Sequence, residues 1–314
     1  MHELYSTRAN PLIDPSLHVW GWEIAVYLFL GGLVAGIMII GGYFMYRGRH
    51  TESICVCEQL PMLGLVLLSA GMIALFLDLE DKWHVWRFYL TFQIASPMSW
   101  GSWILLLVYP VLVLTLAIRP PRYLTQRFTA LDRARNFLRG RSGLVRRIGM
   151  ASMVLGAGLG IYTGILLSAL GARPLWNSPL LGFIFLLSGL SSAAALVHLI
   201  SRDPGESRML ARADNMFLTA ESALILLFLI GLITTSRVHE EAAVLLLTGA
   251  FAPVFWVFVI ALGIIIPLII QSLAVAGKIR HVPASPVLVM AGGLALRFVI
   301  VAAGQASHWA STIH

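Results

Sequence analysis

Eight long apolar segments, separated by shorter polar ones, dominate the chain. They occupy residues 20–46, 60–77, 100–118, 148–171, 179–200, 215–234, 250–275 and 285–303. An α-helix needs about 20 predominantly apolar residues to cross the hydrocarbon core of a bilayer, and a chain in lipid must pair its backbone polar groups internally. The pattern therefore predicts an all-α integral membrane protein with eight transmembrane helices.

The loops on the two sides of these segments differ in their basic residues. The loops predicted on one side of the membrane carry 16 lysines and arginines in total, and those on the other side carry five. The remaining basic residue, Arg297, lies inside the last segment. Loops rich in lysine and arginine stay on the cytoplasmic side, so we expect both termini to face outward, to the periplasm in a bacterium. The longest loop, 119–147, holds nine arginines and is predicted to form a surface helix on anionic headgroups.

The composition agrees with a membrane protein and argues against other classes. Hydrophobic residues make up 58% of the 314-residue chain and charged residues 12%, with a mean hydropathy of +0.84; soluble domains are less apolar. No cleavable signal peptide is expected, because no basic region followed by an apolar one opens the chain. The net charge of +7 reflects topology, so we expect lipid and not nucleic acid around it.

Cysteine and histidine are too few in the apolar segments to hold a metal centre. Cys55 and Cys57 share one short polar loop, and two thiols make neither a disulfide framework nor an iron–sulfur site. Of nine histidines only His198 is expected inside a segment, whereas a haem b anchor needs paired axial histidines. We therefore expect no metal, haem or iron–sulfur cluster in this chain.

The first segment carries an acid among apolar residues. Glu23 lies in its first turns and Tyr27 follows one turn later, so both lie on one face of the predicted helix. Ionisable residues inside a membrane are costly and usually mark functional sites. Glu23 has a simpler interpretation as well, in which its side chain only reaches to the outer surface.

Two further residues are predicted at a similar outer depth, Tyr162 in the fourth segment and Arg297 in the eighth. Provided that the first, fourth and eighth helices are neighbours, an acid, two phenols and a guanidinium meet there. A quinone headgroup needs hydrogen-bond donors for two carbonyl oxygens and a titratable group for proton exchange. The set favours a quinone site, although the tyrosines alone are typical of packing and Arg297 is equally suited to pair with a carboxylate.

A second set of ionisable residues is a candidate for proton transfer. Asp214 and Glu221 lie seven residues apart, on nearly the same face of the sixth segment and toward the inner side. Ion pairs with Arg208 or Arg212 explain them equally well. Asp78 and His84, at the outer surface after the second segment, are further proton-transfer candidates.

Five stretches in order resemble the NrfD/PsrC family, membrane subunits of polysulfide-reductase-like and related complexes. They are WGWEIAVYLFLGGLVAG, ASPMSWGSWILL, RPLWNSPLLGFIFLLSGLSSAAAL, APVFWVFVIALGIIIPLII and LRFVIVAAGQ. The resemblance implies two four-helix bundles, 1–174 and 175–314, with a quinone site in the first and no haem. It matches Glu23, Tyr27 and Tyr162 to the family's quinone contacts, with Tyr27 standing where the polysulfide-reductase member has histidine. Arg297 falls in the last stretch.

The resemblance also implies the partners and the cellular context. The expected substrate is menaquinone or ubiquinone, in a bacterial inner membrane. A four-cluster, ferredoxin-like iron–sulfur subunit docks on the outer face, with a molybdopterin, hydrogenase or cytochrome catalytic subunit beyond it. Alone, the chain would have no complete enzymatic activity. A transporter is the rival class, but its paired broken helices have only one counterpart here, at Pro267.

Overall fold

The computed structural model describes residues 20–48, 58–79, 82–90, 92–94, 96–127, 129–201, 203–278 and 283–307. Eight helical stretches in these ranges are long and apolar enough to cross a membrane, which confirms the predicted number. They are α1 (Trp22–Tyr46), α2 (Leu60–Asp78), α4 (Pro97–Ile118), α7 (Ser142–Ser168), α8 (Leu180–Ile200), α9 (Pro204–Thr235), the continuous pair η5 (Val254–Ile265) and α11 (Ile266–Val275), and α12 (Ala284–Ala306).

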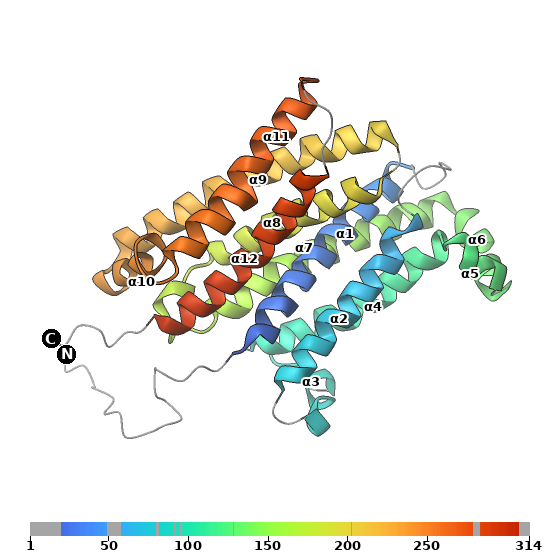
Figure 1. Cartoon of the computed structure of the whole chain (residues 1–314). Helices are drawn as coiled ribbons and strands as arrows, with labels where there is room; N and C mark the ends of the chain where they lie inside the picture. Colours follow the sequence, from blue (N-terminus) through green and yellow to red (C-terminus); the bar gives the residue numbers. More distant parts are fainter. Residues whose placement is uncertain are drawn as a thin grey trace.

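Helix α1 occupies the centre of the arrangement (Figure 1). It packs against α2, α7, α8 and α12; α4 lies against α2 and α7, while α9 lies against α8 and α11. Glycines allow these close contacts, because a Cβ at Gly36 would overlap Gly189 and Ala193 of α8, and one at Gly42 would overlap Gly149 of α7. The predicted adjacency of the first helix to the fourth and to the eighth is therefore confirmed.

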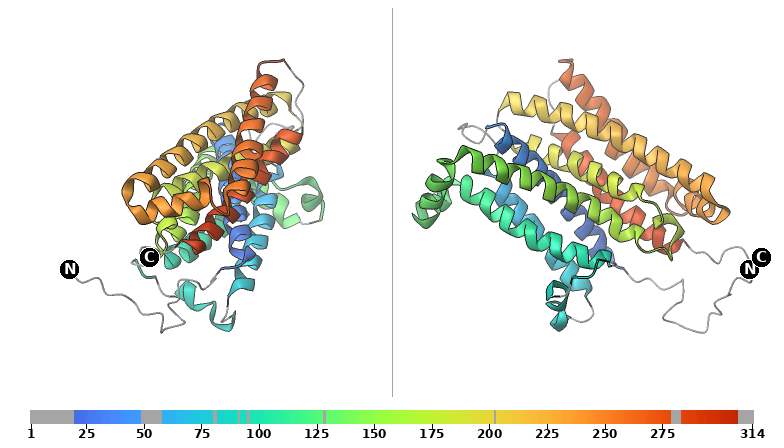
Figure 2. Two further views of the ribbon diagram at one scale, coloured as in Figure 1. Left: turned by 60° about the vertical axis from the view of Figure 1, so that its left-hand side comes forward. Right: turned by 180° about the vertical axis from the view of Figure 1, so that it is seen from behind.

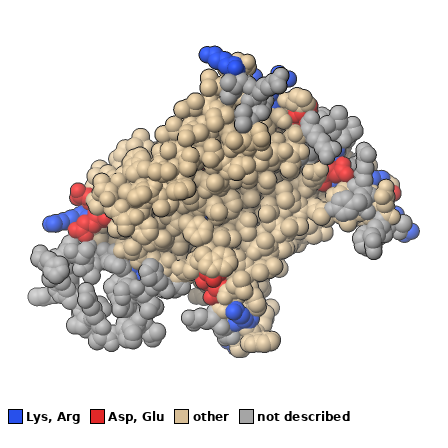
Figure 3. Space-filling model, viewed as in Figure 1, with Lys and Arg blue, Asp and Glu red and all other residues tan. Residues whose placement is uncertain are grey.

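The two ends of the helix bundle carry the short elements. We use "outer end" for the end at which α1 begins, which the charge bias predicts to face outward. There lie η3 (Lys82–His84), α3 (Arg87–Leu90), η4 (Pro174–Trp176) and α10 (Arg237–Leu247), whereas α5 (Arg122–Arg127) and α6 (Thr129–Arg139) lie at the other, inner end (Figures 1 and 2). Charged side chains gather at both ends, with a broad uncharged belt between them (Figure 3).

The basic segment 119–147 is helical, as predicted. Asp132 and Arg135 of α6 form an ion pair at 2.5 Å, and the Arg141 guanidinium lies 4.3 Å from the centre of the Phe137 ring. Leu138 faces inward, into an apolar cluster with Ile118 and other residues at the inner ends of the helices. Its contact with lipid headgroups stays a prediction.

Helix α9 begins eleven residues before the apolar segment that predicted it. Asp203 caps it, because its carboxylate accepts hydrogen bonds from the backbone N–H groups of Gly205 and Glu206 at 3.1 and 3.2 Å. Pro204 stands at the start of the helix, where the fixed φ angle of proline already suits the helical backbone. Hydropathy alone missed this polar first part, which holds the buried Glu206.

The seventh span is wound as a π-helix, η5, before it returns to α-helix in α11. Pro267 stands just after the change; it has no N–H group and so offers no ordinary bond to the carbonyl four residues earlier. The sequence predicted an interruption at Pro267 but not a π-helix. Cys55, Cys57 and the segments 1–19 and 308–314 lie outside the described residues.

Candidate functional site

Glu23 stands in the first turn of α1, at its outer end. The turn follows Gly21, over which the Glu23 carboxylate folds back. A carboxylate in the first turn interacts favourably with the positive end of the helix dipole. Glu23 is half-buried and forms no hydrogen bond or ion pair with any residue that the structure describes.

Tyr27 lies one turn deeper and is buried, with 3% of its surface exposed. Its ring lies at van der Waals distance from Gly71 of α2. The Tyr162 phenol of α7 is among the titratable groups around it. Tyr27 therefore faces the space between α1, α2 and α7, and not lipid.

Tyr162 reaches the same space from α7 and is 5% exposed. Its phenol lies directly against Gly101 of α4, and a Cβ at that position would overlap the hydroxyl oxygen and two ring carbons. A glycine is therefore required at 101 for this position of the ring. The prediction that the first and fourth helices bring two phenols together agrees with this arrangement.

Glu23, Tyr27 and Tyr162 share one property: none is hydrogen-bonded to any part of the chain that the structure describes. Two phenols and a carboxylate whose side chains are not hydrogen-bonded within the described residues, grouped at one end of two neighbouring helices, are suited to bind a ligand with polar oxygens.

Arg297 of α12 lies in a different environment. It is fully buried; its Nη1 donates to Ser188 Oγ at 2.5 Å and to Gly293 O at 3.0 Å, and its Nη2 donates to Phe185 O at 2.9 Å. Its guanidinium also interacts electrostatically with Glu221 of α9. The three hydrogen-bond acceptors are a hydroxyl and two backbone carbonyls; none of them is a carboxylate, and none belongs to Glu23, Tyr27 or Tyr162.

Asp214 and Glu221 are held in the same polar network. Ser191 Oγ donates to Asp214 Oδ1 at 2.5 Å and Gln271 Nε2 donates to Oδ2 at 2.6 Å, while Glu221 lies near Ser188 and Arg297. We call these residues, with Arg297, the polar network; it joins α8, α9, α11 and α12. The alternative ion pairs with Arg208 and Arg212 are not found among the described residues, and Arg208 Nε donates to Pro204 O.

Asp78 and His84 lie at the outer end, away from the centre of the bundle. Asp78 is the last residue of α2 and is half-buried, while His84 is exposed in η3. Sequence reasoning missed the serines 188 and 191 of α8, and Gln271 of α11. The two serines are in the stretch LSGLSS, where small residues predict only close packing.

Neither the phenols nor the network forms a metal site. No group of three or more histidine, cysteine, aspartate or glutamate residues placed to hold a metal ion exists in the part of the chain that the structure describes. The side chains of the two regions are phenols, carboxylates, hydroxyls, one amide and one guanidinium.

Comparison with known proteins gives consistent results over nearly the whole chain. The family model described as "Polysulphide reductase, NrfD" matches residues 11–308. The C polypeptide of the Wolinella succinogenes polysulfide reductase is 30% identical over 303 residues, which cover 91% of this chain and 94% of that protein. Protein NrfD of Escherichia coli is 31% identical over 304 residues, covering 91% and 95%. The C component of the Salmonella typhimurium tetrathionate reductase is 26% identical over 184 residues, covering 58% and 48%.

Proposed function

Because the chain belongs to the NrfD family, we propose that it is the quinone-reactive membrane subunit of a respiratory reductase complex. Relatives are named as components of polysulfide and tetrathionate reductases, which supports a role inside a multisubunit complex. In this role the protein exchanges electrons between the quinone pool, menaquinone or ubiquinone, and a docked four-cluster iron–sulfur subunit. A molybdopterin, hydrogenase or cytochrome subunit beyond that partner completes the reaction.

The observation that carries the proposal is the unused hydrogen-bonding capacity of Glu23, Tyr27 and Tyr162. A quinone presents two carbonyl oxygens, and two phenols donate one hydrogen bond each. Two-electron reduction also adds two protons, so the site needs a group that gains and loses protons. We assign the oxygens to Tyr27 and Tyr162 and the proton exchange to Glu23, which stands nearest the outer end.

The surrounding architecture follows from the same proposal. The packing of α1, α2, α4 and α7, and of α8, α9, α11 and α12, supports two four-helix bundles that divide the chain at 1–174 and 175–314. The quinone site belongs to the first. The excess of basic residues at the inner end supports outward-facing termini in a bacterial inner membrane, with the iron–sulfur subunit docked at the outer end.

A role in proton transfer is the second element of the proposal. Asp214 and Glu221 are buried carboxylates within a network of hydroxyl and amide groups. Arg297 Nε, Ser192 Oγ and Gln271 Oε1 are buried without a partner among the described residues, and ordered water commonly bridges such atoms. Asp78 and His84 are placed to exchange protons at the outer surface, and Arg297 sets the charge near Glu221.

The test is quinol-dependent reduction of the iron–sulfur partner by the complete complex. We expect Glu23→Gln and Tyr162→Phe to lower the rate, the first by about 10²-fold or more because a general acid–base group is lost. Tyr43→Phe is the matched control, since Tyr43 is 41% exposed near the inner end of α1. Wild-type rates in both site variants would refute the assignment, and paired haem bands in the visible spectrum would favour a haem anchor instead.

A further inference from the structure

The first turns of α9 carry a groove at the inner end of the bundle. Its volume is about 450 Å³, and the described residues that line it are Gly205, Arg208, Met209, Arg212, Ala213 and Met216. They recur every three or four residues, so they form one stripe along a single face of the helix. The volume is within the range of about 300–1,000 Å³ that is usual for ligand sites. We call these six residues the α9 groove.

Two guanidinium groups lie on this stripe, one helical turn apart. Arg208 and Arg212 are both exposed. Arg208 Nε donates to Pro204 O at 3.4 Å, which holds the side chain along the helix and leaves its two Nη groups for another acceptor. Neither arginine forms an ion pair with a residue that the structure describes. The groove therefore carries two positive charges without an anionic partner in the described part of the chain.

The carboxylates on the same part of α9 are engaged elsewhere. Asp203 accepts hydrogen bonds from the backbone N–H groups of Gly205 and Glu206 at 3.1 and 3.2 Å. Glu206 is fully buried and accepts from Ser201 Oγ at 3.2 Å, and Asp214 belongs to the polar network. These acids cap the helix or face the protein interior, so the outward stripe keeps its positive charge.

The groove is apolar at its deeper end. Met209 packs against an apolar cluster that includes Phe44 of α1 and Leu60 of α2, while Met216 is 71% exposed. From Gly205 to Met216 the helix rises by ~16 Å toward the middle of the bundle. The stripe thus passes from basic to apolar side chains with depth, in the same order as the phosphate and the acyl chains of a phospholipid.

We propose that the α9 groove binds an anionic phospholipid. Its phosphodiester is bound by Arg208 and Arg212, since the planar guanidinium presents N–H donors that match phosphate oxygens, and the first part of an acyl chain lies along Ala213 and Met216. Basic pockets between membrane helices commonly hold such headgroups. The proposal does not depend on the quinone site, because the groove lies at the opposite end of the bundle from the phenols.

Thermal unfolding of the purified full-length protein in detergent, with phosphatidylglycerol as the probe, tests the proposal. A ligand that binds only the folded state stabilises it, so we expect phosphatidylglycerol to raise the thermal midpoint. Phosphatidylethanolamine, which has no net charge, should raise it less, and inorganic phosphate should leave it unchanged. The Arg208→Gln, Arg212→Gln double variant should bind phosphatidylglycerol about tenfold or more weakly, measured by native mass spectrometry.

A second double variant is the matched control. Arg133→Gln with Arg147→Gln also removes two exposed arginines of the inner end, but from α6 and α7, and should keep the wild-type affinity. Equal losses in the two double variants would show only general attraction to a basic surface and would overturn the site. Equal stabilisation by inorganic phosphate would overturn the lipid as its ligand, and so would wild-type protein that binds no phosphatidylglycerol.

Discussion

The two halves of the molecule place their polar groups at different depths and in different surroundings. In the first half the phenols and Glu23 lie toward the outer end, and an apolar cluster follows on the inner side. That cluster includes Val34 of α1, Leu68 of α2, Leu105 of α4 and Leu159 of α7, each on the inner side of the polar site along its own helix.

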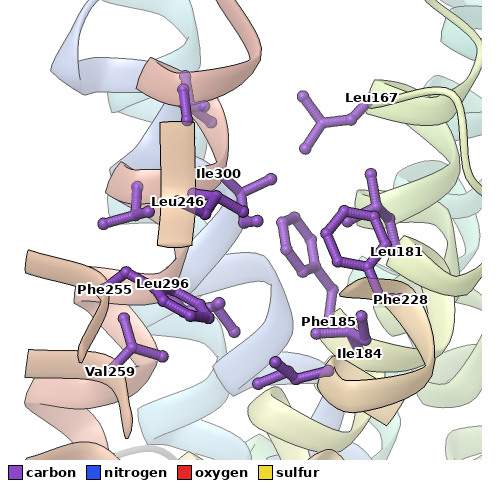
Figure 4. Packing of buried hydrophobic residues seen from close by; sticks show 14 of the residues in the cluster. Leu167, Leu181, Ile184, Phe185, Phe228, Leu246, Phe255, Val259, Leu296 and Ile300 are labelled. Atoms are coloured by element: carbon purple, nitrogen blue, oxygen red, sulfur yellow. The ribbon is translucent and has the colours of Figure 1, made fainter. Parts of the chain in front are cut away.

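In the second half the polar groups are embedded in apolar side chains. Phe185 of α8, Phe228 of α9, Phe255 of η5 and Ile300 of α12 belong to one buried cluster (Figure 4), and the directions of their helices put all four outward of Ser188, Glu221, Gln271 and Arg297. Other members of the cluster, Leu218 of α9 and Val289 of α12, lie inward of Glu221 and Arg297. Apolar residues therefore flank the network on both sides.

The two regions also differ in their hydrogen bonds. Arg297, Asp214 and Glu221 each have partners within the protein, whereas Glu23, Tyr27 and Tyr162 have none in the described part of the chain. The bonds of Arg297 and Asp214 stabilise the fold, whereas the phenols of the first half keep their hydrogen-bond donors for a ligand. Substitutions in the network should therefore affect stability first, and substitutions among the phenols should affect binding first.

The largest expected effect is that of Arg297→Ala. Removal of the guanidinium leaves Ser188 Oγ, Gly293 O and Phe185 O without this donor in the interior, and each buried group left unpaired costs about 1–3 kcal/mol. We therefore expect a lower yield of folded protein and earlier thermal aggregation in detergent. Arg237→Ala is the control, because Arg237 forms only a surface ion pair with Glu241 at 3.7 Å, worth about 0–1 kcal/mol.

A double variant sharpens this prediction. Arg297→Met with Glu221→Leu removes both charges and should recover part of the stability, since apolar replacements of a buried pair are often neutral. A thermal midpoint of Arg297→Ala equal to the wild type would contradict the structural role of the network. The two halves would then differ only in where their polar groups lie, and not in what those groups do.

Gly101→Ala should have a smaller effect on stability and a clear one on binding. The new methyl group overlaps the Tyr162 phenol and must displace its ring. Overpacking of this kind costs about 1–3 kcal/mol. We expect weaker binding of heptyl-hydroxyquinoline N-oxide, a fluorescent quinol analogue, and a fall in the thermal midpoint that is smaller than that of Arg297→Ala. Gly158→Ala on α7 is the control, because a Cβ there meets nothing within 4 Å; equal affinities in the two variants would contradict the site.

The sequence predicted the spans well because hydropathy reports directly on burial in lipid. It also brought Tyr27 and Tyr162 together, since depth along a helix follows from residue number and only the adjacency of helices had to be assumed. Depth along a helix does not give the direction around its axis. For that reason the sequence did not separate the phenols from Arg297, which bonds to Ser188 and Phe185 of α8 and lies against Gly32 of α1.

Other parts depend on tertiary contacts that no local pattern reports. Gln271 reaches Asp214 from a helix that follows the π-helical turns of η5, and these change which residues face inward. Trp176, at a position typical of an interface anchor, is instead buried, stacked on Trp20 at 5.2 Å and bonded to Ile300 O.

The smallest predicted effect concerns the junction of the two halves at the outer end. Gln305 of α12 holds the start of α1 by two hydrogen bonds, one from Trp20 N to Oε1 and one from Nε2 to Trp20 O, both 2.9 Å. Gln305→Ala removes both and should cost about 1–2 kcal/mol. Because Glu23 follows Trp20 by three residues, the local loss should appear as faster amide hydrogen exchange over the first turn of α1. Ser285→Ala, at the inner end of α12 with one long bond of 3.4 Å to Pro267 O, is the control. Unchanged exchange at α1 in Gln305→Ala would show that Glu23 is held in place by the first half alone.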